Sequence, residues 1–283
     1  MCGIFEGYGQ ILSDFEQKFQ EEISSRLKNT NETLREGIKY CLFGAGKRLR
    51  PVLLLKAAEA SGANERDAFL LAAAIECIHC YSLVHDDLPA LDNDDLRRGK
   101  LSAHKKFGEG QAILIGDAAL NLSIEIVLSP EKMNNKYLKA ARAIFGTAGA
   151  DGMLKGQSLD ISTDKSGNAT LAAIKNIHIH KTAVLLSAAI GAGLRLGNSS
   201  EKLMDAALEA SLHLGLAYQI ADDLKDFKEG RDADKFTYPK ILGKENAETE
   251  LAVTLAKAYY IIKPYRKLNF LVDFAKYIKD SAL

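Results

Sequence analysis

Two aspartate-rich segments are the parts of the sequence most suited to chemistry. The first carries five carboxylates within ten residues, 86–95, beginning with Asp86 and Asp87. Carboxylates this close raise one another's pKa unless a cation lies between them, and all-oxygen ligands suit a hard cation such as Mg²⁺, which readily shares its ligands with phosphate. The segment follows the apolar run 75–84, so its first aspartates are expected at a buried helix end.

A second acidic segment has the same layout. Asp222 and Asp223 end the apolar run 212–220, and Asp226 follows. Asp222 and Asp226 are four residues apart, so both carboxylates project from one face of a helix. One acidic helix end is common on protein surfaces, but two of them predict a shared cation cluster that clamps a diphosphate.

Basic residues supply the complementary charge. Residues 44–51 place three cations beside a glycine turn. The segment is similar to a phosphate-binding P-loop, but Arg48 stands at the Ser/Thr position and Cys41 at the first glycine position. Positive charges are therefore expected to bind the anion in place of backbone amides. Arg97 and Arg98 offer bidentate contacts to phosphate, and Lys181-Thr182 and Lys235 add to the set.

Helices must position all of these residues. Apolar residues recur at spacings of three and four, alanine-rich runs favour helix, and alternating strand patterns are scarce. The pattern predicts about ten helices packed as a large all-α bundle. No long flexible linker and no repeat of fixed period are seen, so residues 1–283 are expected to form a single domain.

Composition argues against several other classes of protein. Lys plus Arg and Asp plus Glu both number 37, and the zero net charge gives no overall field for nucleic acid. With no run of about 18 apolar residues and no signal-peptide layout, we expect a cytoplasmic protein that does not span a membrane. Cys77 and Cys80 form a C-x-x-C pair, which invites a zinc or redox interpretation, but they lie in an apolar helical run and are expected in the core.

With these motifs in place, the chain resembles the trans-type polyprenyl diphosphate synthases, the family that contains farnesyl and geranylgeranyl diphosphate synthases. Residues 86–92 match the first aspartate-rich motif of that family, in the form with two extra residues, and residues 222–226 match the second. The remaining matches follow in the family's order: 46–51, 78–99, 116–118, 152–160, 180–182, 215–226 and 235–243. The resemblance implies an isoprenoid synthase fold, a homodimeric helical bundle around a deep central apolar cavity.

The resemblance also implies a reaction and a set of roles. A Mg²⁺-dependent enzyme would join isopentenyl diphosphate to dimethylallyl or geranyl diphosphate, giving (E,E)-farnesyl diphosphate by ionisation, condensation and elimination. About three Mg²⁺ per site, with Mn²⁺ as a substitute, would be held by Asp86, Asp87, Asp92, Asp222 and Asp226, and the catalytic set would include Asp223 and Lys181. The allylic diphosphate would be held by Arg97, Lys181, Thr182, Gln219 and Lys235, and isopentenyl diphosphate by Lys47, Arg50, His79 and Arg98.

Product length is expected to depend on Tyr81. This residue lies five positions before Asp86, about 7 Å deeper along a helix, where an aromatic ring would act as a floor for the growing chain. The alternative is that Tyr81 packs against a neighbouring helix. We therefore predict a farnesyl product, with geranylgeranyl as the alternative. A non-catalytic partner subunit and a terpene cyclase rank lower, because the six motif aspartates and the isopentenyl-binding cations are all present.

Two features depart from the family pattern, and a third is similar to another family. Residues 227–234 form a shorter link after the second motif than the family usually has, and Lys225 places a cation inside that motif. The opening Met1-Cys2-Gly3 is similar to the start of glutamine amidotransferases, in which Cys2 is the nucleophile, but nothing downstream supports that fold.

Overall fold

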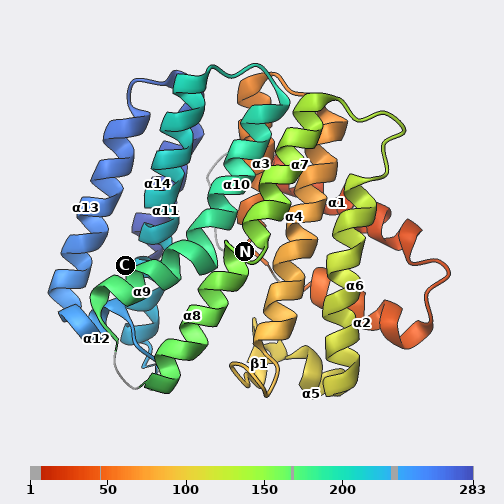
Figure 1. Cartoon of the computed structure of the whole chain (residues 1–283), viewed down its shortest axis with the longest axis horizontal. Coiled ribbons are helices and arrows are strands. Elements are labelled where there is room, and N and C mark those ends of the chain that lie inside the picture. Colours follow the sequence, from red (N-terminus) through yellow and green to blue (C-terminus); the bar gives the residue numbers. More distant parts are fainter. Residues whose placement is uncertain (1–7, 45, 167–168, 231–234, 283) are drawn as a thin grey trace. The chain divides into compact units, whose positions relative to one another are not determined.

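The computed structural model describes residues 8–44, 46–166, 169–230 and 235–282 (Figure 1). These residues form fourteen α-helices, a π-helical turn, a 3₁₀ turn and one two-stranded hairpin, so the all-α prediction is confirmed. The helices outnumber the expected ten or so partly because α5 and α12 have five residues each, too few to give a periodic pattern. Cys2 and part of the short link 227–234 lie outside the described residues.

The chain divides into two compact units, Met1–Leu55 with Arg66–Met133, and Lys56–Glu65 with Asn134–Leu283. The prediction of one domain over residues 1–283 stays a prediction.

The first unit is built around α4 (Glu65–Asp86). Every residue of this helix from 68 to 78 is buried, which explains why its sequence is apolar on all sides. Phe15 on α1 stacks on Phe19 with ring centroids 5.3 Å apart and also contacts Phe69 of α4. The other elements of this unit are α1 (Gly9–Arg26), α2 (Glu32–Leu42), the start of α3 (Leu49–Ser61), β1 (Leu96–Arg97), β2 (Lys100–Leu101), α5 (Ala103–Phe107) and α6 (Glu109–Val127).

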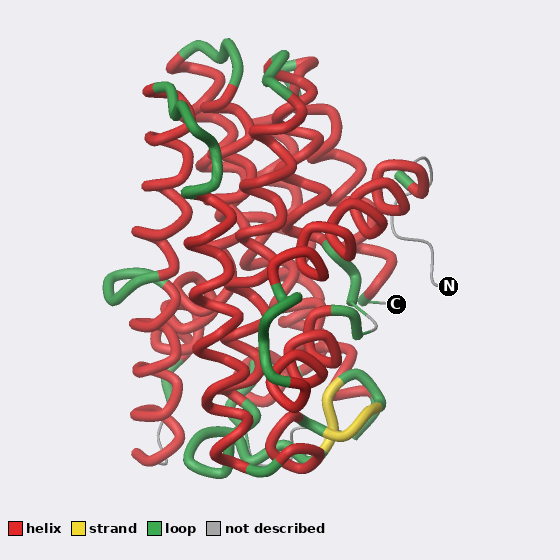
Figure 2. The backbone as a smooth tube through the Cα atoms, turned by 90° about the vertical axis from the view of Figure 1, so that its right-hand side faces the viewer, coloured by secondary structure: helices red, strands yellow, loops and turns green. Residues whose placement is uncertain are grey.

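The hairpin, yellow in Figure 2, follows the first aspartate cluster. Leu96 pairs with Leu101 and Arg97 with Lys100, which leaves Arg98 and Gly99 as the two-residue loop. Both loop residues have positive φ, 55° and 76°, as a type I′ turn requires. A non-glycine residue rarely adopts this conformation, so Arg98 is held in a costly backbone geometry next to the candidate site.

In the second unit α11 (Glu201–Lys228) packs against α13, α10 and α14, and α10 lies against α7 (Figure 1). Ser200 caps the start of α11 by accepting a hydrogen bond from the Leu203 amide. A Cβ atom on Gly215 would lie 2.5 Å from the Cα of Ala183, so only glycine lets α11 approach the π-helical turn this closely. The other elements are α7 (Asn135–Ala148), α8 (Met153–Ser166), α9 (Leu171–His178), the π-helical turn η1 (Ile179–Ala183), α10 (Val184–Leu196), α12 (Tyr238–Leu242), α13 (Lys244–Ile262), the 3₁₀ turn η2 (Arg266–Leu268) and α14 (Asn269–Ser281).

Three helical stretches are long and apolar enough to cross a membrane by length and composition alone: Glu65–Asp86, Glu109–Val127 and Leu171–Leu196. Composition by itself therefore does not exclude a membrane span, although the sequence interpretation had assumed that it did. In the first and third stretches 78% and 72% of the apolar window is buried inside the protein, against 44% in the second. Burial in the core gives a sufficient reason for the apolar composition of the first and third.

Candidate active site

The first aspartate cluster begins at the last residue of α4, Asp86. The chain then turns sharply, and the Asp92 amide donates a hydrogen bond to the Asp86 carbonyl over 2.9 Å. The Asn93 amide bonds to the Leu88 carbonyl, and Asn93 itself has a φ of 53°. This turn brings Asp86 and Asp92 to the same end of the helix, with both side chains partly exposed. Their carboxylate oxygens are suitable ligands for Mg²⁺.

Asp87 points into the protein. It is 2% exposed, and its Oδ1 accepts hydrogen bonds from Nε of Arg97 at 2.8 Å and from Nη2 of the same side chain. Arg97 also contacts Asp94 at 2.9 Å. Burial raises the pKa of Asp87, while the hydrogen bond and charge of Arg97 oppose that rise. Asp87 therefore holds Arg97 in place at the base of the hairpin.

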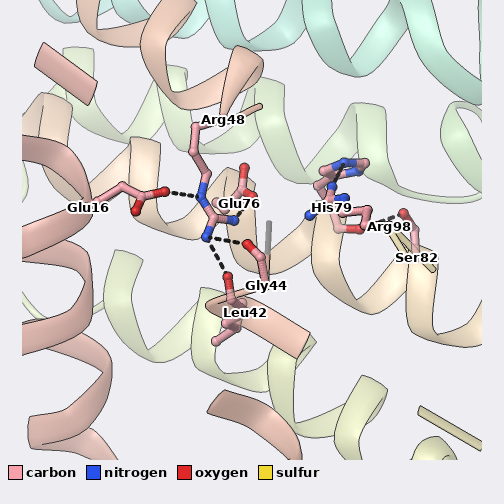
Figure 3. Close-up of polar contacts among 8 residues, drawn as sticks. All are labelled: Glu16, Leu42, Gly44, Arg48, Glu76, His79, Ser82 and Arg98. Atoms are coloured by element: carbon pink, nitrogen blue, oxygen red, sulfur yellow. Dashed lines mark hydrogen bonds and ion pairs between the residues drawn. The ribbon is translucent and has the colours of Figure 1, made fainter. Parts of the chain in front are cut away.

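Arg98, in the loop of the hairpin, lies next to His79 on α4 (Figure 3). The Nη2 of Arg98 lies 3.5 Å from Nε2 of His79. Burial, and then the positive charges of Arg50 and Arg98, lower the pKa of His79 well below its ordinary value. The imidazole is therefore neutral near pH 7 and can accept a hydrogen bond from a guanidinium.

A cleft in the first unit opens beside these residues. It contains about 560 Å³ of space, part of which is open solvent. Cations line it together with two carboxylates and an apolar wall from α4 and the hairpin. Its lining is Tyr40, Cys41, Gly44, Glu76, His79, Cys80, Leu83, Val84, Asp87, Arg97, Arg98, Lys100, Leu101, Ser102 and Ala103.

The second aspartate cluster lies near the end of α11. Asp222 and Asp226 are partly buried and share one face of the helix, as their spacing predicts. Asp223 is buried, and its Oδ2 lies 3.1 Å from Nε2 of His178 and accepts a hydrogen bond of 2.9 Å from the Tyr238 amide. The rings of His178 and Tyr238 stack with centroids 5.6 Å apart. Asp223 thus ties α11 to α9 and to the start of α12.

Lys181 lies on the π-helical turn between α9 and α10. Its Nζ donates a hydrogen bond of 2.7 Å to Asp160 on α8. A Cβ atom on Gly156 would lie 2.2 Å from the Lys181 amide nitrogen, so glycine at this position lets α8 contact the turn directly. Single π-helical turns occur frequently at functional sites, and this one carries both Lys181 and Thr182.

The sequence is similar to those of known proteins over most of its length. The family model described as polyprenyl synthetase matches residues 31–266. This chain belongs to the polyprenyl synthetase family. It is 35% identical to the farnesyl diphosphate synthase of Bacillus subtilis over 268 residues, covering 89% of this chain and 90% of the relative. It is 36% identical to a heterodimeric geranylgeranyl pyrophosphate synthase large subunit of Arabidopsis thaliana, covering 85% and 71%.

A solved geranyltransferase structure from Legionella pneumophila has the same architecture. It superposes with a TM-score of 0.85 at 33% sequence identity, and the match covers 96% of each chain. The predicted family and the predicted fold, an isoprenoid synthase helical bundle, are both confirmed. This polyprenyl synthetase is a prenyltransferase that acts on small diphosphate substrates.

The structure groups most of the predicted residues of each unit. In the first unit Asp87, His79, Arg97 and Arg98 share the cleft, Lys47 lies on the segment that leads into α3, and Arg50 lies in the first turn of α3. In the second unit Thr182 and Gln219 are partly buried, and Lys235 lies three residues before Tyr238, the first residue of α12. Within the described residues no group of three or more His, Cys, Asp or Glu side chains is close enough to hold a metal. The ligand roles therefore remain predictions.

Tyr81 is buried on α4 and packs edge-on against His85, with ring centroids 5.9 Å apart. His85 in turn lies 3.2 Å from the Ile113 carbonyl, and a Cβ atom on Gly116 would lie 2.2 Å from its Nε2. Tyr81 therefore packs against a side chain that itself contacts α6, and its role as a floor for the product stays a prediction.

The position of the Arg48 side chain differs from the expectation that this residue helps to bind the anion. Figure 3 shows its guanidinium surrounded by protein acceptors, and its side chain is 3% exposed. The partner that sequence interpretation missed is Glu76, a carboxylate inside the long buried run of α4. A lone charge in such a run signals a buried partner, and Arg48 is that partner. Sequence interpretation also missed Asp160 as the partner of Lys181.

The two cysteines of the C-x-x-C pair are core residues, as expected. Cys77 and Cys80 are buried free thiols, and burial raises the pKa of both. Burial also raises the pKa of Cys41 to about 12. Thiols with such raised pKa values are poor nucleophiles and poor metal ligands at neutral pH.

Proposed function

We propose that this polyprenyl synthetase is a Mg²⁺-dependent farnesyl diphosphate synthase, with geranylgeranyl diphosphate as the alternative product. The observation that carries the proposal is the parallel construction of the two clusters. In each, the second aspartate of the pair is buried and bonded to the protein, while the first and last aspartates stay partly exposed. Relatives with both product names match at similar identity, so the product rests on Tyr81 alone.

The metal ligands would be the outer aspartates of both clusters, Asp86, Asp92, Asp222 and Asp226, while the inner Asp87 supports the first cluster through its bond to Arg97. The donor set fits a hard cation, because it consists of carboxylate oxygens and two of them, Asp86 and Asp92, are joined by a backbone hydrogen bond. When bound, Mg²⁺ supplies charge that neutralises the departing diphosphate. Mn²⁺ is expected to substitute.

The protein's own cations would also bind the diphosphate and stabilise its negative charge. Arg97, which Asp87 positions, and Lys181, which Asp160 positions, would bind the allylic diphosphate together with Thr182, Gln219 and Lys235. As the allylic carbon–oxygen bond breaks, these groups stabilise the charge on the leaving oxygens. The double bond of isopentenyl diphosphate, held by Lys47, Arg50, His79 and Arg98, attacks the allylic cation, and transfer of a proton from the condensed product to the released diphosphate completes the reaction. Apolar surroundings must exclude water, which would otherwise capture the cation.

The chain is proposed to act as a cytoplasmic homodimer with one catalytic domain over residues 1–283. Four large apolar side chains stay exposed along α6 and its end, and a second copy would cover them: Ile113 at 46%, Leu114 at 52%, Ile124 at 41% and Leu128 at 59%. Sedimentation that gives a monomer at micromolar concentration would contradict this assembly. The zero net charge supports the absence of a nucleic-acid partner.

One assay tests the function. The purified protein is incubated with Mg²⁺, dimethylallyl diphosphate and isopentenyl diphosphate, and the dephosphorylated products are sized by chromatography. Farnesol is the expected product, and geranylgeraniol would support the alternative. A lack of any elongated product would favour a non-catalytic partner subunit. The Tyr81→Ala variant should lengthen the product, and an unchanged product would remove the floor role from Tyr81.

A further inference from the structure

We propose that Arg48 and Glu76 are positioning residues, a buried ion pair that holds the isopentenyl diphosphate-binding cations in place without touching the substrate. The inference rests on the proposed role of Lys47, Arg50, His79 and Arg98. Within the segment 46–51 Arg48 is buried, whereas Arg50 is half-buried.

The donors of Arg48 are taken up by the protein. Nη1 donates to Glu76 Oε1 at 2.5 Å, and Nε donates to Glu16 Oε1 at 3.0 Å. Nη2 donates to the Leu42 carbonyl at 2.6 Å and to the Gly44 carbonyl at 3.5 Å. Figure 3 shows these bonds arriving from three sides. A guanidinium whose donors already bond to protein acceptors has few N–H groups left for a diphosphate, whereas the neighbouring Lys47 is exposed.

These bonds fix the path of the backbone that leads into α3. The carbonyls of Leu42 and Gly44 come from the end of α2, and Glu76 comes from α4, so one side chain joins both elements to the start of α3. Arg48 itself has a φ of 49°, a left-handed conformation that a non-glycine residue adopts only when its surroundings enforce it. The conformation directs Arg48 inward between Lys47 and Arg50.

The pair also reaches the other half of the substrate-binding group. A Cβ atom on Gly46 would lie 2.5 Å from Nη1 of Arg98 and 3.3 Å from Nη1 of Arg48, so the Gly46 backbone lies against both guanidinium groups. Glu76 precedes His79 by one helical turn on α4. The chain that carries Lys47 and Arg50 is therefore held against the surface that carries His79 and Arg98.

Glu76 contributes charge as well as geometry. Its Oε2 is buried and accepts no hydrogen bond within the described part of the chain, so its charge acts through space on the cations around it. Burial lowers the pKa of Arg98, and the negative charge of Glu76 opposes that fall. Without Glu76, Arg48, Arg97 and Arg98 would lie close together with less compensation, and their mutual repulsion would spread the site.

The test separates the two substrates. The KM for isopentenyl diphosphate and the KM for geranyl diphosphate are measured for Arg48→Gln, Glu76→Gln and Arg48→Lys. We expect the isopentenyl KM to rise by about tenfold or more in the first two and to a smaller extent in Arg48→Lys, which keeps the charge but cannot reach all the acceptors. The geranyl KM should change by no more than about twofold, because other residues bind that diphosphate. Arg26→Gln, which breaks a partly buried ion pair with Glu22 on α1, is the matched control and should leave both KM values unchanged.

The outcomes distinguish the inference from the function on which it rests. If Arg50→Ala leaves the isopentenyl KM unchanged, the proposed binding residues are wrong. If Arg50→Ala raises it and the Arg48 and Glu76 variants lower only Tm, the ion pair is merely structural and the inference is overturned. Should Arg48→Gln fail to fold, Glu16→Gln serves instead, because the Glu16 side chain is 40% exposed and its loss is mild. A rise of about two- to threefold in the isopentenyl KM is then expected, and no rise would overturn the proposal.

Discussion

In the first aspartate cluster the inward carboxylate, Asp87, is held by the guanidinium of Arg97, whereas in the second cluster Asp223 is held by His178 and the Tyr238 amide. The outer carboxylates also reach their positions differently. Asp86 and Asp92 are brought together by a turn closed with a backbone hydrogen bond, while Asp222 and Asp226 need only the periodicity of α11. The first cluster therefore depends on a loop conformation, and the second on a helix and its anchor.

Replacing the outer aspartates should give the largest effects. Asp86→Ala and Asp222→Ala should each lower turnover by about a thousandfold or more, equivalent to about 4 kcal/mol, because each would remove a ligand of the cation cluster. Steady-state assays with saturating Mg²⁺ measure the effect. Both side chains are partly exposed, so Tm should change little. Near-normal turnover in either variant would remove the metal role from that aspartate.

The inner aspartates should differ in stability. Asp223→Ala leaves the buried Tyr238 amide and His178 without their acceptor and should cost about 2–3 kcal/mol. Asp87→Ala should cost less, about 1–2 kcal/mol, because the Arg97 side chain is 35% exposed and keeps its contact with Asp94. Urea unfolding measures both values. Asp223→Asn, which retains an acceptor for the amide, is the control, and equal losses for the two alanine variants would contradict the distinction.

The turn gives a test that applies to the first cluster alone. Asn93 has a φ of 53°, which a β-branched side chain tolerates poorly, so Asn93→Val should cost about 1–2 kcal/mol and lower turnover by disturbing the turn between Asp86 and Asp92. Asn93→Gly should be close to neutral in both respects. If valine were as well tolerated as glycine, the geometry of the first cluster would not depend on this turn.

The smallest expected effect concerns His79, which lies near the arginines beside the first cluster. Burial, together with the positive charges of these arginines, lowers the pKa of His79 from its ordinary value of 6.5. At pH values below about 6.5 the unfolded chain then binds a proton at this residue that the folded chain does not, so stability falls as the pH drops through that window and is constant above it. His79→Gln should make the fall in Tm between about pH 7 and about pH 5 shallower. An unchanged slope would show that His79 titrates normally.

Much of the site followed from the sequence because the chemistry is concentrated in short segments. The pairing of Asp222 with Asp226 needs only helix periodicity, and the place of Asp86 at a buried helix end follows from the apolar run before it. Arg48 shows where this reasoning fails. Its sequence neighbours suggested that it binds the anion, yet a carboxylate 28 positions further along the chain turns it inward.

The sequence by itself determined the helical class and the family, because periodicity and local motifs depend on neighbouring residues, and it predicted the charged residues of the two aspartate clusters. Tertiary structure alone decided which side chain each of these charged groups contacts: Asp87 contacts Arg97, Asp223 contacts His178, Lys181 contacts Asp160 and Arg48 contacts Glu76. The physical reason is burial. A charge taken from water must find a partner, and the partner is fixed by packing between elements that are distant in sequence.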